Sequence, residues 1–356
     1  MSAQRVGILG VGLVTAGGVG VNETWRALKA GTDNQSSRLC PDGVTRRVHT
    51  AAPGEDKLFA LAWSAIGEAL AGSNLRPDTI CLGSSSDTIA GREMGRYAPA
   101  PLIVDQLATA LTIANKYQFS NACASSSVAI ATAMDLIRSG RSRVALAGGV
   151  DEVTFSSIAG FDACRIYSDR CRPFAAGRNG LVLADGAAFL LLVPDGMGEP
   201  LAYLTGAGLA SDAAHMAAMT EDGVLRAMAG ALTESGLTFV DAIIAHGTAT
   251  QRNDLVEANA INSRWSGLPR PLIASYKGIL GHPQGASGAV GAVLAVKALL
   301  AQRMFATVSA ADIDEELAIG NVVTTVSESV RLRTIMCLSH GTWGVYSALV
   351  MSEARP

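Results

Sequence analysis

The chain has 356 residues, of which 49% are hydrophobic, 17% are charged and 5% are aromatic. This composition excludes an intrinsically disordered chain, because disorder needs low hydrophobicity together with high net charge. The formal net charge of −3 gives no electrostatic reason to expect nucleic acid or an anionic membrane as a partner. The length fits about two domains, and 38 glycines predict a core of small side chains with closely approaching backbones.

The apolar runs, the N-terminal segment and the spacing of the cysteines all bear on where the protein is located. Gly, Arg, Asp or Pro interrupts every apolar run before about 18 residues, so we expect no membrane span. The N-terminal segment lacks a basic region and contains several glycines, which favours a buried strand over a signal peptide. The six cysteines form no CxxC pair, and no Cys/His cluster has zinc spacing. We therefore expect a reduced, cytoplasmic protein with neither metal nor cofactor.

Short aliphatic runs alternate with helical patterns, which predicts an α/β fold with buried strands. The expected strands are Val6–Val11, Thr79–Leu82, Val144–Ala147, Ala188–Val193, Ala242–Ala245, Leu272–Ser275 and Thr334–Leu338. The expected helices are Leu58–Ala71, Ser125–Ser139, Gly223–Ser235, Asp254–Trp265 and Ala286–Gln302, with a short one after Tyr97. Turn residues between Pro194 and Pro200 mark a seam. We therefore predict two similar halves, residues 1–195 and 196–356, packed face to face.

Cys123 stands between an expected turn and an expected helix. Small residues flank it in Asn121-Ala-Cys-Ala-Ser125, as a tight strand-to-helix turn requires. Unpaired N–H groups and the dipole at the helix start are expected to lower the pKa of the thiol. The pattern alone leaves two interpretations open, a nucleophile or an inert core thiol, because free cysteines are commonly buried.

Two histidines lie in similar contexts at the ends of expected strands. His246 ends the apolar run 241–245, and His282 comes five residues after Lys277. Sites in α/β folds collect where a strand is followed by a turn and a helix. A single histidine is more often structural than catalytic, but two in matching contexts also allow a functional pair, so both interpretations stay open. Metal binding is the weaker alternative, because no acidic or thiol ligand stands at helical spacing from either histidine. Asp254 is expected to be the N-cap of the helix after His246.

Six motifs, taken in order, resemble those of β-ketoacyl synthases. They are Ala122-Cys-Ala-Ser-Ser-Ser127, Leu146-Ala-Gly-Gly-Val150, Arg172-Pro-Phe174 with Arg178-Asn-Gly180, Ala184-Asp-Gly-Ala187, Ala245-His-Gly-Thr-Ala-Thr250 with Asp254 and Glu257, and Lys277-Gly-Ile-Leu-Gly-His282. The resemblance covers most of the chain from about Ile80 onward. It implies a thiolase-like fold, in which two βαβαβαββ-type halves form a five-layered αβαβα core, and usually a dimer.

The resemblance also implies an acyltransferase, a ketosynthase that condenses an acyl thioester with malonyl-acyl carrier protein by decarboxylation, in bacterial type II polyketide or specialised fatty acid biosynthesis. Cys123 would accept the acyl group. His246 and His282 would stabilise the enolate left when carbon dioxide departs. Lys277 would order the His282 loop, and Glu257 would support the same network. The implied partners are an acyl carrier protein bearing acyl or malonyl groups and a second subunit, either an identical chain or a homologous ketosynthase or chain-length-factor subunit.

The sequence departs from the family pattern in three places. The chain is short for the family, and much of the shortfall lies around Asp87–Leu111. Ala175 stands where an aspartate usually follows Arg-Pro-Phe. The family's Gly-Phe-Gly-Gly-Thr-Asn motif is replaced by Ser339-His-Gly-Thr-Trp-Gly-Val-Tyr346, so Thr342 falls at a gating phenylalanine whose backbone N–H forms an oxyanion hole with the cysteine N–H. The resemblance then assigns four residues to the acyl pocket: Phe161, Phe174, Thr342 and Trp343.

These departures keep two alternatives open. One is a chain-length-factor-like partner subunit without a nucleophile, and the other is an acyltransferase of ketosynthase fold with little or no condensing activity. Retention of Cys123, His246, His282 and Lys277 argues against the first. Thr342 cannot fill the volume of a phenyl ring, so the expected pocket admits conjugated or branched acyl groups.

Overall fold

The computed structural model describes residues 5–32, 35–51, 56–95, 101–212, 219–307, 312–326, 329–342 and 344–354. The strands are β1 (Val6–Thr15), β2 (Gly18–Val19), β3 (Ser36–Leu39), β4 (Thr45–Val48), β5 (Thr79–Gly83), β6 (Asn115–Phe119), β7 (Ala145–Asp151), β8 (Gly186–Pro194), β9 (Ala202–Ser211), β10 (Ala242–Ile244), β11 (Leu272–Ala274), β12 (Thr334–Gly341) and β13 (Val345–Glu353). The helices are α1 (Val21–Ala30), α2 (Lys57–Leu70), α3 (Ile89–Glu93), α4 (Ile103–Leu111), α5 (Ser125–Arg138), α6 (Phe155–Ala163), α7 (Glu221–Ser235), α8 (Gln251–Arg264), α9 (Lys277–Leu280) and α10 (Ser287–Ala301). Two 3-10 turns precede the central helices: η1 (Ala122–Ala124) before α5 and η2 (Gln284–Ala286) before α10.

Two groups of strands repeat one topology. The first half has the order β6-β5-β7-β8-β1, and the second has the order β11-β10-β12-β13-β9. In each half the first three strands of this order run parallel, and the last two pair antiparallel to their neighbours. The halves join where Val6 to Ile8 of β1 pair with Ala202 to Leu204 of β9. The change from one half to the other falls between β8 and β9, in the turn-rich stretch of the sequence.

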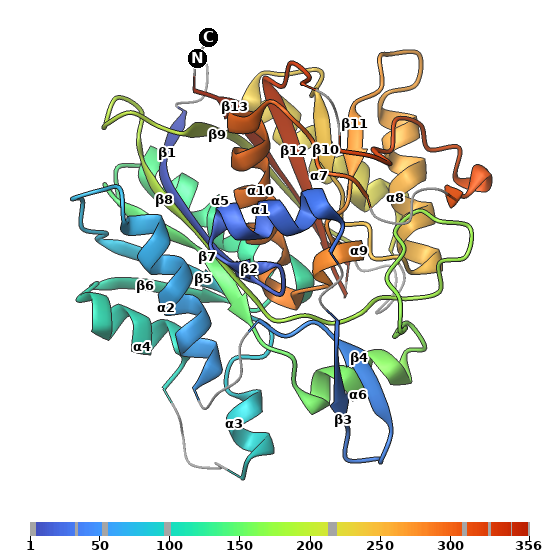
Figure 1. The fold of residues 1–356 in the computed structure, drawn as a ribbon. Helices are drawn as coiled ribbons and strands as arrows, with labels where there is room; N and C mark the ends of the chain where they lie inside the picture. The colour runs from blue at the N-terminus through green and yellow to red at the C-terminus, as the bar shows by residue number, and fades with distance from the viewer. Residues whose placement is uncertain are drawn as a thin grey trace.

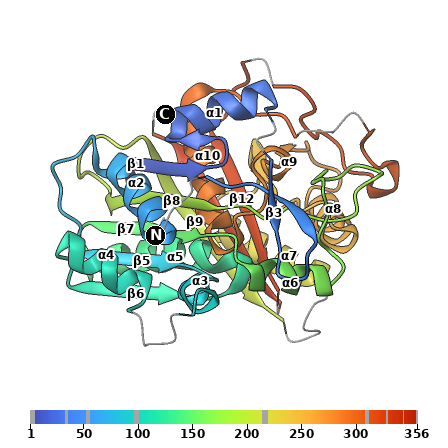
Figure 2. The same cartoon turned by 60° about the horizontal axis from the view of Figure 1, so that its bottom comes forward.

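The helices form three layers around these strands. Helices α2 and α4 cover the outer face of the first half, and α7, with α8 beside it, covers the outer face of the second. Helices α5 and α10 pack against each other and against strands of both halves, so they form the middle layer (Figure 1, Figure 2). The predicted five-layered αβαβα order is therefore confirmed.

Glycines set the close approach of strands and outer helices in both halves. A Cβ added at Gly10 of β1 would overlap the backbone carbonyl of Ala69 in α2. A Cβ added at Gly208 of β9 would overlap the carbonyl of Ala227 in α7 in the same way. Only a residue without a Cβ allows this contact between helix and strand backbones. The high glycine content thus has the packing role that the composition predicted.

Helix α10 is apolar on all sides because strands and helices surround it. The segment Gln284–Ala301 is long and apolar enough to cross a membrane, so the expectation that no run reaches this length is wrong. However, 83% of that segment is buried inside the protein. A helix that is hydrophobic all round is typical of the centre of a layered fold as well as of a membrane span. The burial identifies α10 as a core helix.

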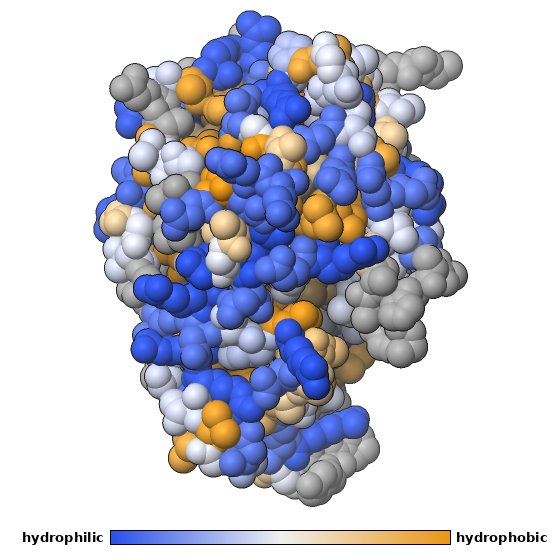
Figure 3. Space-filling view, turned by 90° about the vertical axis from the view of Figure 1, so that its right-hand side faces the viewer, coloured by the Kyte–Doolittle hydropathy of each residue, from blue (hydrophilic) through white to orange (hydrophobic). Residues whose placement is uncertain are grey.

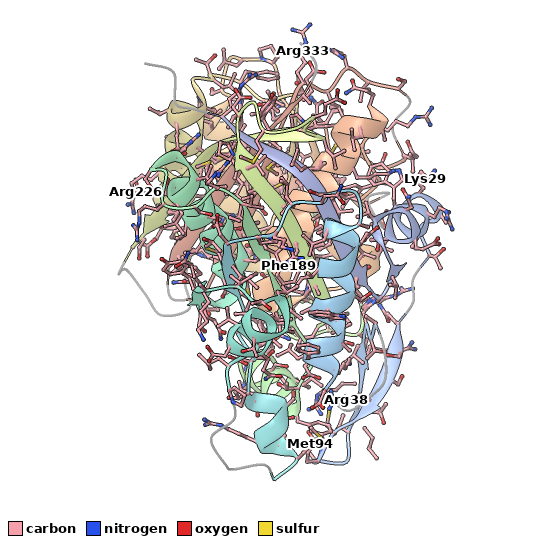
Figure 4. All side chains as sticks on the ribbon, turned by 90° about the vertical axis from the view of Figure 1, so that its left-hand side faces the viewer. Lys29, Arg38, Met94, Phe189, Arg226 and Arg333 are labelled. Carbon is pink, nitrogen blue, oxygen red and sulfur yellow. The ribbon has the colours of Figure 1, made fainter. Side chains whose placement is uncertain are left out.

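The interior and the surface differ as expected for a globular fold. Phe189 of β8 is fully buried and lies in the interior, whereas Lys29, Arg226 and Arg333 lie at the periphery (Figure 4). Hydrophilic residues cover most of the side that carries α8, and hydrophobic residues there form small patches (Figure 3). Scattered apolar residues of this kind are ordinary on protein surfaces.

All strands and helices predicted from the sequence are present, with ends shifted by a few residues. In the large sheet, the prediction missed β2, β6, β9 and β13, and elsewhere it missed the β3–β4 pair and helices α1, α3, α6 and α9. Strand β6 is polar at its start, and β9 contains two glycines that weaken strand propensity. These two strands form because neighbouring strands pair with them, and such pairing depends on residues far away in the sequence.

Candidate active site

Cys123 lies at the start of the buried helix α5. The chain leaves β6, turns at Ala122, whose φ is +50°, and enters η1. The Ser125 hydroxyl donates to Ala122 O (2.6 Å) and accepts the N–H of Asn121 (2.8 Å), which closes the turn. The structure therefore has the tight strand-to-helix turn expected around Cys123, and only 6% of this residue is exposed.

His246 and His282 reach the site from the second half. His246 follows β10, and His282 follows α9. Their ring centroids are 5.4 Å apart, and the ring planes are nearly perpendicular, at 85°. Both residues are buried. The structure thus brings together two imidazoles that lie far apart in the sequence.

Two buried charged residues hold the His246 segment. Lys277 Nζ donates to the backbone carbonyl of His246 (2.5 Å). Glu257 of α8 accepts the backbone N–H groups of His246 (2.7 Å) and Gly247 (2.8 Å). Because Lys277 begins α9, which leads to His282, its side chain links the two histidine loops.

Asp254 is not the N-cap of α8, so that prediction is wrong. Thr250 is the N-cap, and its side chain accepts the N–H of Asn253. Asp254 lies in the first turn, fully buried, and accepts the N–H groups of Phe174 (2.7 Å) and Ala249 (3.2 Å). A side chain that turns inward to distant backbone donors cannot cap its own helix.

A buried arginine near Ala175, the position where the family pattern has an aspartate, is paired with a carboxylate from elsewhere in the chain. Arg178 is buried, donates to Ala175 O (3.0 Å) and forms an ion pair with Asp314. A buried guanidinium needs such a partner, because an unpaired buried charge is strongly destabilising. Asp314 precedes a short 3-10 turn far from Arg178 in sequence, so the motif itself does not reveal it.

One cavity of about 260 Å³ is lined by Cys123, His246 and His282. Phe161 and Thr342 also line it, as the resemblance implied. Phe174 does not line this cavity: it is fully buried and packs in the hydrophobic cluster of the second half. Trp343, the remaining expected pocket residue, lies outside the described residues.

Burial sets the ionisation of the central groups. It raises the pKa of the Cys123 thiol to about 12, although the Lys277 ammonium acts in the opposite direction. Desolvation therefore outweighs the Lys277 charge, and the expectation of a lowered thiol pKa is wrong. Burial and the nearby Lys277 charge lower the pKa of both His246 and His282 well below the usual value. The two imidazoles are therefore neutral at neutral pH.

The supporting charges shift as well. Burial lowers the pKa of Lys277 to about 8, while Glu257 opposes the shift. Burial acts to raise the pKa of Glu257, but His340 and the N–H donors of Gly247 and His246 outweigh it, so this pKa is lowered. Both side chains are buried, and each is hydrogen-bonded to the backbone of His246.

Sequence reasoning missed two side chains at this site. His340, at the end of β12, places its ring 5.1 Å from that of His246, with Nε2 3.5 Å from Glu257 Oε1. Ser287, the first residue of α10, places its hydroxyl 2.9 Å from His282 Nδ1. The unusual sequence around His340 was a usable signal, whereas nothing local distinguishes Ser287.

This arrangement is suited to thioester chemistry. One thiol and two neutral imidazoles line the same cavity, and no Asp or Glu of the described residues lines it. Neutral imidazole N–H groups can stabilise an oxyanion without transferring a proton to it. Within the described ranges, no group of three or more His, Cys, Asp or Glu is arranged to hold a metal ion.

Comparisons with known proteins match both halves. The family model for the β-ketoacyl synthase N-terminal domain matches residues 114–195, and that for the C-terminal domain matches residues 201–311. Nodulation protein E of Rhizobium sp. (strain N33) is 37% identical over 190 residues, which cover 51% of this chain and 47% of that protein. The match thus spans about half of that relative. The 3-oxoacyl-[acyl-carrier-protein] synthase 1 of Haemophilus influenzae is 27% identical over a 408-residue alignment covering 98% of this chain and 99% of the relative.

Solved structures show the same fold over the whole chain. A chain of the ishigamide ketosynthase/chain length factor has a TM-score of 0.89 at 24% identity, with 99% of each chain covered. One chain in the structure of a complex between a type II polyketide synthase acyl-carrier protein and its ketosynthase has a TM-score of 0.88 at 24% identity, and the match covers 99% of this chain and 99% of that chain. The predicted thiolase-like fold is therefore confirmed.

Proposed function

The chain belongs to the β-ketoacyl synthase family, and from this premise we propose that it is a ketosynthase that condenses an acyl thioester with malonyl-acyl carrier protein. The observation that carries the proposal is the convergence of Cys123, His246 and His282 on one cavity. A partner subunit that only shapes a chain tunnel needs neither the thiol nor the paired imidazoles. Bacterial type II polyketide or specialised fatty acid biosynthesis is the setting we propose.

The first step transfers the acyl group to Cys123. The sulfur attacks the thioester carbonyl, the thiol proton passes to the departing pantetheine sulfur, and a cysteine thioester forms. Because burial keeps the resting thiol protonated, this proton must move during the step, and the neutral imidazole of His246, whose Nδ1 has no hydrogen-bond partner among the described residues, is competent to carry it. Backbone N–H groups of Cys123 and Thr342 are proposed to hold the oxyanion. In support, a Cβ on the neighbouring Gly341 would lie only 2.6 Å from Asn121 O, so the β12 end abuts the turn.

The second step makes the nucleophilic carbon. The malonyl group loses carbon dioxide, and the electron pair of the broken C–C bond becomes an enolate whose oxygen carries negative charge. Nε2–H donors from His246 and His282 stabilise that oxygen. The enolate carbon then attacks the acyl-Cys123 carbonyl, the C–S bond breaks, and the released thiolate takes up a proton from solvent water. The product is a β-ketoacyl thioester on the carrier.

The cavity mouth fits an acidic carrier protein. Arg165 and Arg252 line the cavity and are exposed. Thr248 and Thr250 lie on the same wall and offer hydroxyls to the amides of a pantetheine arm. We assign carrier docking to this mouth. For the second subunit, β6 ends the strand order, so within the described chain its outer edge can pair with another strand. A cytoplasmic location remains a prediction.

Intact-mass analysis after incubation with acyl- and malonyl-carrier proteins tests the proposal. The expected result is an acyl adduct that maps to Cys123 and a carrier-bound β-ketoacyl product. Acylation without condensation would favour the acyltransferase alternative. Neither acylation nor condensation, in a folded protein supplied with both carriers, would favour the partner-subunit alternative.

A further inference from the structure

The two imidazoles of the site are held differently. Ser287 Oγ lies 2.9 Å from His282 Nδ1, and both residues are buried. In contrast, His246 Nδ1 is buried and has no hydrogen-bond partner among the described residues. His246 is instead positioned through its backbone, by Lys277 and Glu257. Only His282 therefore has a side-chain partner on its Nδ1 atom.

The direction of this hydrogen bond follows from the available acceptors. A serine hydroxyl has one hydrogen to donate, and a neutral imidazole has one nitrogen that donates and one that accepts. Within the described ranges, the Ser287 hydroxyl has no hydrogen bond other than that to His282 Nδ1. The Ser287 carbonyl is occupied separately by the Tyr276 hydroxyl (2.9 Å), which fixes the start of α10. Donation to Nδ1 is the arrangement that gives this hydrogen an acceptor among the described residues.

We propose that Ser287 is a positioning residue that fixes His282 as the Nε2–H tautomer and thereby makes it an obligate hydrogen-bond donor to the enolate oxygen. This inference rests on the proposed function and assigns the decarboxylation step to that donor. When Nδ1 accepts the hydroxyl hydrogen, the ring proton resides on Nε2. His246, without such a partner, is free to exchange its ring proton.

The charge state of His282 supports this assignment. A charged imidazole would carry hydrogen on both nitrogens and could not accept from Ser287. Burial and the Lys277 ammonium lower the pKa of His282 well below its usual value, so the ring is neutral at neutral pH. A neutral ring is the only state in which a neighbour can select the tautomer.

Nitrogen-15 NMR of histidine-labelled protein tests the tautomer directly. In the wild type, His282 Nδ1 is expected to be unprotonated and hydrogen-bonded, with the hydrogen on Nε2. In Ser287→Ala, the Nδ1 resonance should move toward that of a free imidazole that samples both tautomers. A wild-type spectrum with a protonated Nδ1, or unchanged ring resonances in Ser287→Ala, would overturn the proposal.

Kinetics separate positioning from general structural damage. Removing an oxyanion donor outright costs about 10²–10³-fold in kcat. Ser287→Ala keeps the imidazole, so we expect a smaller loss in malonyl decarboxylation, about tenfold in kcat, with KM unchanged because the contact matters in the transition state. Acyl transfer to Cys123 should keep its wild-type rate. Equal losses in both steps would overturn the assignment.

Two further variants serve as controls. Ser347→Ala removes another buried serine hydroxyl, which donates to Ser339 O (3.0 Å) and, among the described residues, has no hydrogen bond to an imidazole. It should leave the His282 resonances and the decarboxylation rate unchanged. Ser287→Thr retains the hydroxyl and should restore both. A folded Ser287→Thr protein with the spectrum and rate of the alanine variant would also overturn the proposal.

Failure of the proposed function has a different signature. If the wild type releases no carbon dioxide from malonyl-carrier protein, the ketosynthase proposal fails and the catalytic role of Ser287 falls with it. The NMR experiment needs no substrate and still decides whether Ser287 fixes the tautomer. Normal decarboxylation together with unchanged His282 resonances in Ser287→Ala would leave the ketosynthase standing and remove this inference alone.

Discussion

The starts of α5 and α10 share one backbone design and differ in chemistry. Each central helix begins at a serine, Ser125 or Ser287, after a 3-10 turn. Each turn opens with a residue of positive φ that is not glycine, Ala122 at +50° and Gln284 at +44°. The positions therefore correspond one to one, and Gly285 is the counterpart of Cys123.

The strand ends that face the two starts are different. At α5, the facing residue is Gly341 of β12, and the thiol of Cys123 lines the cavity. At α10, the facing residue is Asp151 of β7, whose carboxylate accepts the N–H of Gly285 (2.6 Å). A Cβ at Gly285 would lie 2.6 Å from Asp151 Oδ2. The second start therefore has no room for a nucleophile.

Asp151 is itself held by the loop after β5. Its carboxylate accepts the hydroxyls of Ser84 (2.8 Å), Ser85 (2.7 Å) and Ser86 (2.6 Å), and backbone N–H groups of the last two. A fully satisfied buried carboxylate rigidifies its surroundings. The comparison teaches that two helix starts with the same backbone design can differ in use: the thiol at the first lines a cavity, whereas at the second Asp151 and its serine and Gly285 donors, the Asp151 cluster, fill the corresponding space.

Moving the cysteine from position 123 to the corresponding position 285 should cause the largest effect, the loss of acyl-enzyme formation. Cys123→Ala should abolish acyl-enzyme formation and lower condensation by at least about 10³-fold, because loss of a nucleophile leaves only binding and oxyanion stabilisation. Adding Gly285→Cys should not restore acylation, because Asp151 occupies the space that its Cβ needs. Intact mass after incubation with the acyl donor checks both variants. An adduct on residue 285 would show that the two starts are interchangeable.

Removing the imidazole of His282, which precedes α10, should cause the second largest effect, a slower decarboxylation. His282→Ala should lower decarboxylation of malonyl thioester by about 10²–10³-fold, the usual cost of an oxyanion donor. Acyl transfer to Cys123 should persist, because in the proposed mechanism the backbone N–H groups of Cys123 and Thr342, and not His282, hold the acyl oxyanion. Carbon dioxide release and acyl-enzyme mass are measured in parallel. Persistent decarboxylation with lost acylation would reverse the assignment of roles.

Removing hydrogen bonds of the Asp151 cluster should lower the free energy of unfolding. Asp151→Asn replaces one acceptor oxygen with a donor that faces other donors, so we expect the free energy of unfolding to fall by about 2–4 kcal/mol. Chemical denaturation measures it. Glu152→Gln is the matched control: it is the next carboxylate in the chain, and within the described residues its side chain accepts none of these hydrogen bonds. Equal effects of the two variants on the free energy of unfolding would contradict the stabilising role of the Asp151 cluster.

The raised pKa of Cys123, just before α5, predicts how the alkylation rate of its thiol depends on pH. With the pKa of Cys123 raised to about 12, its thiolate fraction should grow about tenfold per pH unit up to pH 10. Iodoacetamide at neutral pH should therefore modify the exposed Cys164 before Cys123. Peptide mass spectrometry of Cys164→Ser, with the pH raised stepwise, follows Cys123 without that competing site. A plateau in its rate below pH 9 would show that the helix dipole outweighs burial.

A larger side chain at Thr342 should cause the smallest effect, a change in the preference among acyl donors. Thr342 is exposed and lines the cavity, and Thr342→Phe should narrow it. We expect acylation by polyunsaturated acyl carriers to fall by about tenfold relative to saturated ones, within the 1–3 kcal/mol that shape discrimination supplies. Acylation rates with paired donors measure this preference. An unchanged preference would place selectivity elsewhere, for example at a subunit interface.

Local sequence was sufficient for the elements whose signals are local. The small residues around Cys123 predicted the turn, and the matching strand-end contexts of His246 and His282 singled out these two histidines as a pair. Local sequence was insufficient for Asp254, which looked like a helix cap but is turned inward by the N–H of Phe174. Phe174 itself fitted a pocket by motif position, yet it packs into the core.

The sequence by itself determined an α/β fold in two halves and singled out Cys123, His246 and His282, because periodicity, turns and motifs are properties of neighbouring residues. Only the tertiary structure decided that the thiol is protonated, that Ser287 contacts His282, and that Asp151 fills the second helix start. These properties depend on desolvation and on contacts between segments far apart in the chain. Burial is a sum over such neighbours, and no local pattern contains it.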